Sequence, residues 1–267
     1  MSDATYIHGT DPEEQGRLAA LNRMTNAAFL QFLALEPQQE VLEIGSGLGI
    51  LAAEAARTVP RGRVVGLEQS SAQLARAPRG VANLEFVQGD AHRLPFDDGV
   101  FDVVYCRYLL EHVADPVQVL REAQRVLRFG GRICLQENDT SLVRHDPATP
   151  TFYKVWNAFA RLQTQLGGDA LIGRKLFRLL REAGVEGEIT LTPAPEVYWF
   201  GHPGFGPWLQ NLIGNIRSQK RDRTGEYRDE QYGGEKHEPS LPDLDVLAEH
   251  RGDPAQKYRE KYRRENQ

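Results

Sequence analysis

The sequence is poor in cysteine and has no long apolar run. Only two of its 267 residues are cysteine, Cys106 and Cys134, and both lie inside apolar segments that resemble strands. Two isolated thiols argue against a disulfide framework or a cysteine-rich metal site. No segment approaches the roughly 20 apolar residues that cross a bilayer. Residues 1–14 lack the basic start and apolar stretch of a signal peptide. We therefore expect no membrane partner and a cytoplasmic protein.

The sequence also lacks an excess of positive charge. It has 32 Lys and Arg against 37 Asp and Glu, which gives a formal net charge of −5. A protein whose main partner is nucleic acid usually carries a basic face, because phosphate neutralisation dominates that affinity. The composition therefore argues against nucleic acid and favours a small-molecule partner. The histidines show no metal-ligand spacing, so we expect no metal.

Short apolar segments alternate with amphipathic ones over the first half of the chain. Strands are predicted at 41–44, 63–67, 84–88, 101–106 and 132–136. Helices are predicted at 13–35, 50–58, 71–77 and 116–127, the last ended by Gly130 and Gly131. Apolar strands that alternate with helices are typical of a parallel sheet covered on both faces, and right-handed crossovers make it doubly wound. Two further strands, at 188–193 and 197–200, would bring the mostly parallel sheet to seven.

The alternation breaks after the fifth strand. Helices at 152–166 and 173–183 interrupt it, and we interpret residues 138–172 as a substrate cap over the carboxyl edge of the sheet. The predicted domains are an N-terminal lid and helix at 1–36, the main domain with its cap at 37–217, and a charged tail at 218–267. Three roles stay open for the tail: it orders a homodimer, covers the pocket, or does nothing.

The strongest motif is a glycine turn between the first strand and its helix, Glu43-Ile44-Gly45-Ser46-Gly47-Leu48-Gly49. Glycines allow a tight turn and let a ligand approach the backbone. The spacing is G-x-G-x-G and not the G-x-G-x-x-G of dinucleotide binders, because Ile50 stands where the later glycine would be. The carboxylate of Glu43 would oppose a pyrophosphate but suits a cationic amino group.

Two more carboxylates follow the next strands. Glu68 ends the second strand, where an acidic side chain accepts hydrogen bonds from ribose hydroxyls in nucleoside-binding α/β folds. Asp90 follows the third strand and could accept from the exocyclic amine of adenine. Either residue alone could be a solvated loop side chain. Their order at consecutive strand ends, behind the glycine turn, favours a nucleoside that carries a cationic group.

Four segments together resemble a known family. VLEIGSGLG, VVGLEQS, FVQGDAHRLPFDDGVFDVVYCRYLLEHV and VLRFGGRICLQE are similar to the successive motifs of class I S-adenosylmethionine-dependent methyltransferases. Within that family, the chain is most similar to the bacterial small-molecule branch that includes the ubiquinone and menaquinone methyltransferases. The resemblance is strong over 41–136 and looser over 6–214. It implies a Rossmann-like fold and S-adenosylmethionine as cofactor, but says little about the acceptor.

The resemblance also implies roles for individual residues. Gly45, Ser46 and Gly47 would line the methionine portion of the cofactor. Glu68 would bind the ribose, with Gln69 beside the adenine and Asp90 and Ala91 at the adenine edge. Arg107 would face the cofactor carboxylate or the acceptor. Tyr6, in the Tyr6-Ile7-His8-Gly9 segment, would belong to a lid that closes over the cofactor; the alternative is a frayed terminus.

The acceptor side is less determined. Methyl transfer needs a general base only if the acceptor must lose a proton, and His112 is the candidate, unless it merely packs its loop. Glu137 and Asp139 end the fifth strand. They could bind a polar acceptor or take its proton, or they could cap the next turn. Tyr153 and Trp156 could wall an acceptor pocket, or belong to the core.

The predicted function is transfer of a methyl group from S-adenosylmethionine to oxygen, nitrogen or carbon of a small molecule, by in-line displacement. Aromatic and isoprenoid metabolites are the candidate acceptors. Two alternatives stay open. The protein could bind the cofactor yet promote a cyclisation or rearrangement, or it could be a non-catalytic cofactor-sensing scaffold. An oxidoreductase is disfavoured by the glycine spacing and by Glu43.

Overall fold

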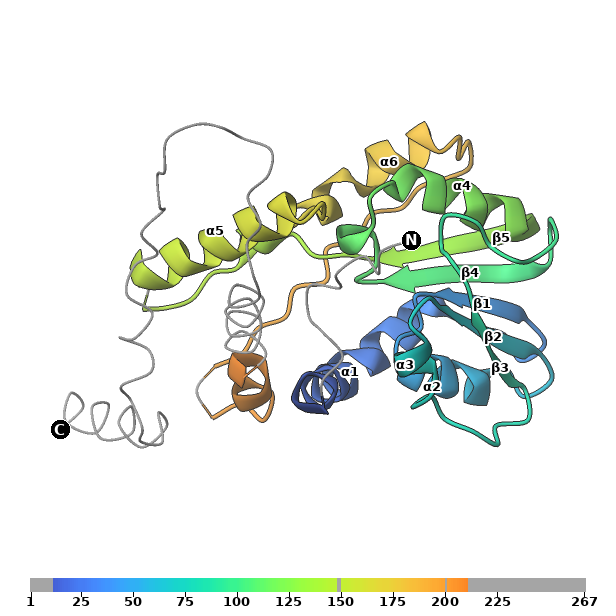
Figure 1. Ribbon diagram of the computed structural model, residues 1–267, viewed down its shortest axis with the longest axis horizontal. Coiled ribbons are helices and arrows are strands. Elements are labelled where there is room, and N and C mark those ends of the chain that lie inside the picture. Colours follow the sequence, from blue (N-terminus) through green and yellow to red (C-terminus); the bar gives the residue numbers. More distant parts are fainter. Residues whose placement is uncertain (1–11, 148–149, 200, 211–267) are drawn as a thin grey trace, which may run out of the picture. The chain divides into compact units, whose positions relative to one another are not determined.

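A computed structural model describes residues 12–147, 150–199 and 201–210 of the chain. Its centre is a parallel sheet in the order β3-β2-β1-β4-β5 (Figure 1). The strands are β1 (Glu40–Ile44), β2 (Arg63–Glu68), β3 (Leu84–Gln88), β4 (Phe101–Arg107) and β5 (Leu127–Gln136). These five strands confirm the five that precede the predicted cap.

The helices follow the predicted alternation. They are α1 (Pro12–Leu33), α2 (Ile50–Thr58), α3 (Ser71–Leu74), α4 (Pro116–Val126), α5 (Pro150–Gln165) and α6 (Leu176–Glu182), with short 3-10 turns η1 (Leu110–His112), η2 (Thr140–Leu142) and η3 (Ile172–Lys175). Local signals explain where α4 begins. The Asp115 side chain accepts a hydrogen bond from the backbone N–H of Gln118 at 2.9 Å, and Pro116 stands at the first helical position, where its missing N–H costs nothing.

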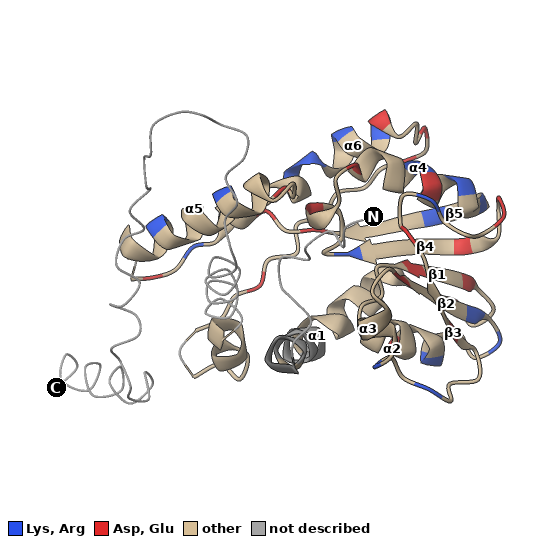
Figure 2. Cartoon of the chain, viewed as in Figure 1, with Lys and Arg blue, Asp and Glu red and all other residues tan. Residues whose placement is uncertain are grey.

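Neighbouring residues on the strands point to opposite faces and build two apolar layers. On one face, Leu42, Val65 and Val104 pack with apolar residues of α4 and α6. On the other face, Val41 and Val103 pack with residues of α1 and α2. Both faces are therefore covered, as the apolar strands predicted. Figure 2 shows charges of both signs along the outer helices α4 and α6.

The strand order determines where a ligand can bind. The chain runs from β1 outward through β2 to β3, and then returns to place β4 on the other side of β1. At such a reversal the connections leave β1 and β4 in opposite directions, which opens a crevice at the carboxyl ends of the two strands. Both the glycine turn and Arg107 lie at these strand ends.

The predicted seven-stranded sheet is not confirmed, because the described residues form five strands. Residues 188–193 and 197–199 form none, and Phe200 lies outside the described residues. The side chains of 190–197 are all exposed, Leu191 to 56%, so the segment buries no apolar face. Pro193 and Pro195 also remove two N–H donors that a ladder would need. Alternating residue types predicted a strand that these exposed side chains do not support.

The fourth helix ends within one residue of its predicted end, but the predicted stop signal, Gly130 and Gly131, was wrong. The helix α4 ends at Val126, and Gly130 and Gly131 lie inside β5. A Cβ atom on Gly131 would lie 2.7 Å from the carbonyl oxygen of Asp102. The glycine is needed for close approach to the neighbouring strand, whereas the sequence pattern indicated a helix stop.

The cap helices lie close to their predicted ranges, as α5 and as η3 with α6. The tail at 218–267 and residues 1–11 fall outside the described residues. The domain boundaries and the homodimer therefore stay predictions. Within the described ranges, no helix is both long and apolar enough to cross a membrane.

Candidate active site

The glycine turn after β1 requires its glycines. Gly45, Gly47 and Gly49 have φ of 74°, 55° and 68°, which is the left-handed region that side chains disfavour. The carbonyl oxygen of Leu67 accepts the N–H groups of Gly45 at 2.8 Å and Ser46 at 2.9 Å. The turn is thus held against the end of β2 by backbone hydrogen bonds.

Glu68 lies directly against this turn, as predicted from its place at the end of β2. One carboxylate oxygen accepts the N–H of Gly47 at 2.9 Å, and the other accepts the N–H of Ser70 at 2.8 Å. Each carboxylate oxygen has a further lone pair. Glu68 therefore fixes the turn and keeps acceptor capacity for a hydroxyl. Its contact with a ribose stays a prediction.

Glu43 is only 4% exposed and lies in a buried polar network below the turn. The hydroxyl of Tyr105 donates to its carboxylate at 3.2 Å. Burial raises the pKa of Glu43 to about 8, although the nearby Arg107 guanidinium and the Tyr105 hydrogen bond lower it. The ionised form of this buried carboxyl would be stabilised by a second cationic group in addition to Arg107.

Arg107 is anchored rather than extended into solvent. Its guanidinium donates to the side-chain oxygen of Asn26 at 2.7 Å and lies over the rings of Phe29 and Tyr108, at 5.5 and 5.4 Å from their centroids. Asn26 in turn donates to Glu54 at 3.0 Å. The arginine therefore joins α1 to the end of β4, beside the crevice. Its predicted contact with the cofactor carboxylate or acceptor stays a prediction.

The residues of the turn fit the methionine portion of S-adenosylmethionine. The Ser46 side chain is 7% exposed, and its hydroxyl has no hydrogen-bond partner among the described residues. An unsatisfied buried hydroxyl is costly, so a polar ligand at this place would stabilise it. When ionised, Glu43 would supply negative charge on the same side of the sheet. The donor set therefore suits a zwitterionic ligand.

The predicted adenine side lies at the ends of β2 and β3. The carbonyl oxygen of Gln69 accepts the side-chain amide of Gln88 at 3.0 Å. Asp90 is 55% exposed and accepts the backbone N–H and the ring nitrogen of His92 at 2.9 and 2.8 Å. Desolvation raises the pKa of Asp90, but these two contacts hold it below its usual value. Ala91 packs on the core.

Two carboxylates lie together on the acceptor side, after β4 and β5. Glu137 accepts the N–H groups of Leu109 at 3.0 Å and Leu110 at 2.8 Å. Burial and the neighbouring Glu111 raise the pKa of Glu137. Glu111 is itself buried and accepts the side-chain amides of Asn138 and Gln163, each at 3.1 Å. Both carboxylates thus serve to hold loops together.

His112 lies beside this pair, with 3.8 Å between its Nε2 and a Glu111 oxygen. Its side chain is 15% exposed. Burial lowers the pKa of His112, although Glu111 opposes that effect. The ring is therefore mostly neutral at pH 7 and able to take a proton, which suits the predicted base but does not test it.

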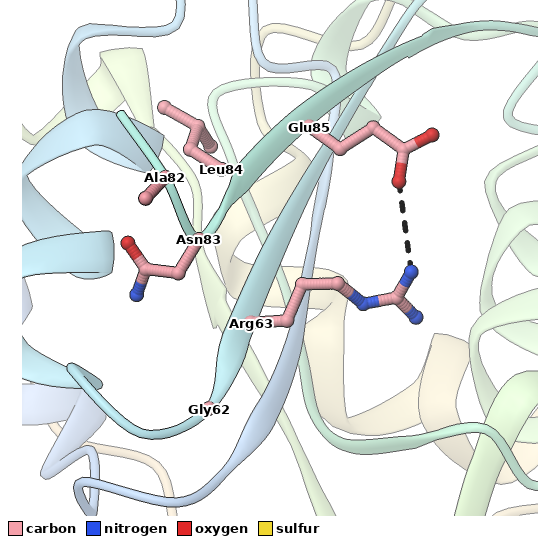
Figure 3. A pocket seen from close by; sticks show the side chains of 6 residues that line it. All are labelled: Gly62, Arg63, Ala82, Asn83, Leu84 and Glu85. Carbon is pink, nitrogen blue, oxygen red and sulfur yellow. Dashed lines mark ion pairs between the residues drawn. The ribbon is translucent and has the colours of Figure 1, made fainter. Parts of the chain in front are cut away.

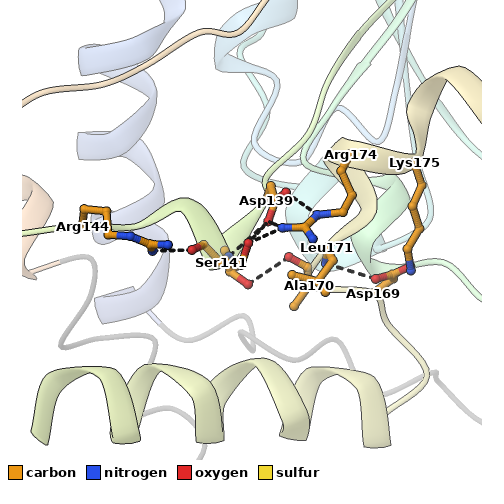
Figure 4. Close-up of polar contacts among 9 residues, drawn as sticks. Asp139, Ser141, Arg144, Asp169, Ala170, Leu171, Arg174 and Lys175 are labelled. Carbon is orange, nitrogen blue, oxygen red and sulfur yellow. Dashed lines mark hydrogen bonds and ion pairs between the residues drawn. The ribbon is translucent and has the colours of Figure 1, made fainter. Parts of the chain in front are cut away.

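Asp139 and Trp156 are engaged in contacts within the segment predicted to be a cap. Figure 4 shows Asp139 paired with Arg174, at 2.6 and 2.9 Å, and with Ser141. Trp156 is 7% exposed and donates from its indole nitrogen to the carbonyl of Thr140 at 2.7 Å. Tyr153 stacks on His145, with ring centroids 5.1 Å apart. These placements favour the capping and core interpretations over direct contact with an acceptor.

Some site residues had no signal in the sequence. Asn26, Tyr105 and Leu109 act through partners 28 to 81 residues away. Tyr108 has φ of 53°, a left-handed conformation that is uncommon outside glycine and often marks functional sites. Tyr6 lies outside the described residues. Among the described residues, no group of His, Cys, Asp or Glu could hold a metal ion.

A hollow of about 320 Å³ lies at the opposite end of the sheet (Figure 3). It is lined by the amino ends of β2 and β3, and Arg63 points toward Glu85 with 3.6 Å between their charged atoms. The side chain of Asn83 is satisfied by the carbonyls of Ala56 and Val59. This end of the sheet carries none of the predicted site residues.

Comparison with known proteins settles the family. Residues 42–135 match the model of a methyltransferase domain. The crystal structure of a "putative methyltransferase" from Bacillus halodurans is 30% identical, with a TM-score of 0.50, over 60% of this chain and 68% of that one. This chain belongs to the class I S-adenosylmethionine-dependent methyltransferases. The predicted family and its cofactor, S-adenosylmethionine, are thus confirmed.

Two curated relatives of this methyltransferase domain are 36% identical to it. One is the ubiquinone/menaquinone biosynthesis C-methyltransferase UbiE of Pseudomonas entomophila, matched over 61% of this chain and 64% of the relative. The other is an uncharacterized protein in a transposon of Streptomyces fradiae, matched over 61% of this chain and 48% of the relative. The chain spans about half the length of several curated relatives that it matches.

Proposed function

We propose that this protein transfers a methyl group from S-adenosylmethionine to a small-molecule acceptor. The observation that carries the proposal is the glycine turn, held open by Glu68 and placed above the buried Glu43 at the β1–β4 crevice. Bound S-adenosylmethionine supplies a methyl group on a positively charged sulfur. The chain needs to hold and orient the two reactants, and positioning can account for much of the rate.

The residues of the chain divide this work. The turn from Gly45 to Gly47 lets the ligand approach the backbone, and Glu43 balances a cationic amino group. Glu68 offers its remaining lone pairs to a diol. If the acceptor must lose a proton, His112 is the proposed base, because burial keeps its ring mostly neutral.

An acceptor with an aromatic ring and an isoprenoid chain is supported by the relatives. The UbiE of Pseudomonas entomophila is by name a C-methyltransferase of ubiquinone and menaquinone biosynthesis. On that basis we propose carbon methylation of a phenol or hydroquinone. The cap supplies a matching apolar element, the cluster of Trp156, Phe159 and Phe152 on α5.

Calorimetric titration with S-adenosylmethionine and S-adenosylhomocysteine tests the cofactor side. We expect micromolar binding, and Glu68→Ala should weaken it by about 1–3 kcal/mol, because a charged acceptor that orders the turn is lost. The matched control is Glu85→Ala, which removes a 58% exposed carboxylate at the other end of the sheet. It should bind like the wild type.

The reaction is tested separately, with a panel of phenols and hydroquinones that carry prenyl chains of different length. Methyl transfer predicts S-adenosylhomocysteine in amounts equal to the methylated product. Consumption of a panel compound without S-adenosylhomocysteine would instead indicate cyclisation or rearrangement. Tight cofactor binding with no consumption of any compound would count against transfer to this acceptor class.

A further inference from the structure

Glu137 connects the end of β5 to the start of η1. A single oxygen of its carboxylate accepts two consecutive backbone N–H groups, from Leu109 at 3.0 Å and Leu110 at 2.8 Å. The other oxygen is buried and has no partner among the described residues. One acceptor oxygen bound to two adjacent amides fixes both the position and the direction of the backbone at that point.

The backbone at this point needs such a restraint. Tyr108 leaves β4 with φ of 53°, which costs free energy in a residue other than glycine and persists only where the surroundings enforce it. Its N–H donates to the carbonyl of Gln136 at 2.9 Å. Together with the two bonds to Glu137, this attaches three successive residues of the β4–η1 connection to the end of β5.

The restrained segment contacts the cofactor turn. A Cβ atom on Gly45 would lie 2.8 Å from one methyl carbon of Leu109 and 3.2 Å from the other. The Leu109 side chain therefore covers the first glycine of the turn, and its position limits the backbone conformations open to Gly45. Displacement of Leu109 would remove this packing from a glycine with φ of 74°, and leave it held by its hydrogen bond to Leu67.

The far side of η1 is attached to the cap. The carbonyl of Glu111 accepts the N–H of Asp169 at 2.9 Å, and the Gln163 side chain donates to the carboxylate of Glu111 at 3.1 Å. These contacts hold the end of η1, two residues beyond Leu109. They leave the start of η1, where Leu109 lies, to Glu137.

We propose that Glu137 is a positioning residue for the cofactor: by binding the N–H groups of Leu109 and Leu110, it holds Leu109 against Gly45 and so orders the glycine turn. The proposal rests on the proposed function, because it concerns the same cofactor site. It differs from the sequence-based prediction, in which Glu137 contacts the acceptor itself.

The test measures binding of S-adenosylhomocysteine to the full chain for Glu137→Ala, Glu137→Gln and Leu109→Ala. Loss of two buried hydrogen bonds should raise the Kd of Glu137→Ala about tenfold or more. Glu137→Gln should stay within about threefold of the wild type, because its amide oxygen can accept the same two N–H groups. Leu109→Ala should resemble Glu137→Ala.

The double variant Glu137→Ala with Leu109→Ala decides whether the two residues act together. If Glu137 acts through Leu109, the double variant binds no more weakly than the weaker single variant. If the Kd of the double variant rises by the product of the two single increases, the proposal is overturned. An unchanged Kd in Leu109→Ala would also overturn it, and this variant can be measured even if Glu137→Ala fails to fold. An unchanged Kd in Glu137→Ala, with a raised KM for the acceptor, would instead support the prediction that Glu137 contacts the acceptor. If the wild type itself does not bind S-adenosylhomocysteine, the proposed function is refuted instead.

Discussion

At the scale of single residues, Glu43 is a titratable carboxyl group in a deeply buried position. Burial raises its pKa from 4.5 to about 8. A carboxyl whose pKa is higher in the folded state contributes stability below its unfolded pKa and loses it as the pH rises through the folded pKa. The apoprotein should therefore lose stability between about pH 5 and 8, and a bound cation beside Glu43 should offset this loss.

Cofactor binding should consequently release protons. We expect the affinity for S-adenosylmethionine to increase as the pH rises from about 6 to 8, because the ligand's ammonium group favours the ionised carboxylate. Titration at pH 7 in buffers of different ionisation enthalpy measures the protons released. Glu43→Gln removes the titrating group and should bind more weakly, with no buffer dependence from this site. Equal enthalpies in all buffers for the wild type would contradict the linkage.

At the scale of elements, the glycine turn is constrained both by its conformation and by its neighbours. Gly49 is the N-cap residue of α2, with φ of 68°, and a Cβ atom there would lie 2.3 Å from the Phe86 ring. Gly99 has nearly the same φ, 66°, but a Cβ atom there would meet nothing within 4 Å. Comparison of the two glycines therefore distinguishes the cost of the left-handed backbone from the cost of steric overlap.

Substitution of both glycines by alanine should give different losses of stability. Gly99→Ala should lower the free energy of unfolding by about 1–2 kcal/mol, the cost of a left-handed residue with a side chain. Gly49→Ala should lose about 1–3 kcal/mol more, because the Phe86 side chain of β3 must move from its place against Gly49. Urea unfolding monitored by circular dichroism compares them. Equal losses would show that Phe86 adapts without cost.

The sequence could predict the features that depend on local signals, but not those that depend on packing between distant segments. The glycine turn, β1 to β5 and Glu68 follow from local signals: apolar runs, glycine spacing and a carboxylate at a strand end. The contacts of Leu109 with Gly45 and of Arg107 with Asn26 depend on packing between distant segments, which no local pattern encodes. The strand predicted at 188–193 is absent for a related reason: a strand needs a neighbouring strand to pair with, and local residue types do not provide one.

At the scale of the whole molecule, the sheet separates two apolar layers, and each contains one thiol. Cys106 is 2% exposed and packs on the α4 side, while Cys134 is 6% exposed and packs on the α1 side. Burial raises the pKa of both thiols, which lowers their fraction of reactive thiolate. The sheet lies between them, so they do not form a disulfide.

A thiol-specific reagent should therefore distinguish the folded from the unfolded chain. Ellman's reagent at pH 8 should react slowly with the native protein and rapidly with two thiols in denaturant, because reaction requires opening of the core. The rate of native labelling then reports how often the layers open. Fast labelling of a thiol in the native protein would show that its layer is less well packed than described. Reducing agent should leave the stability unchanged.

The pairing of β1 with β4 also has a consequence for biosynthesis. The carboxylate of Glu43 and the hydroxyl of Tyr105 are 62 residues apart in the chain. A ribosome that adds about 5–20 residues per second needs several seconds to cover that interval. During that time β1, α2 and β2 can assemble, but the acidic side chain under the turn has not met its partner. The contact between Glu43 and Tyr105 therefore cannot form until the chain up to Tyr105 has been synthesised.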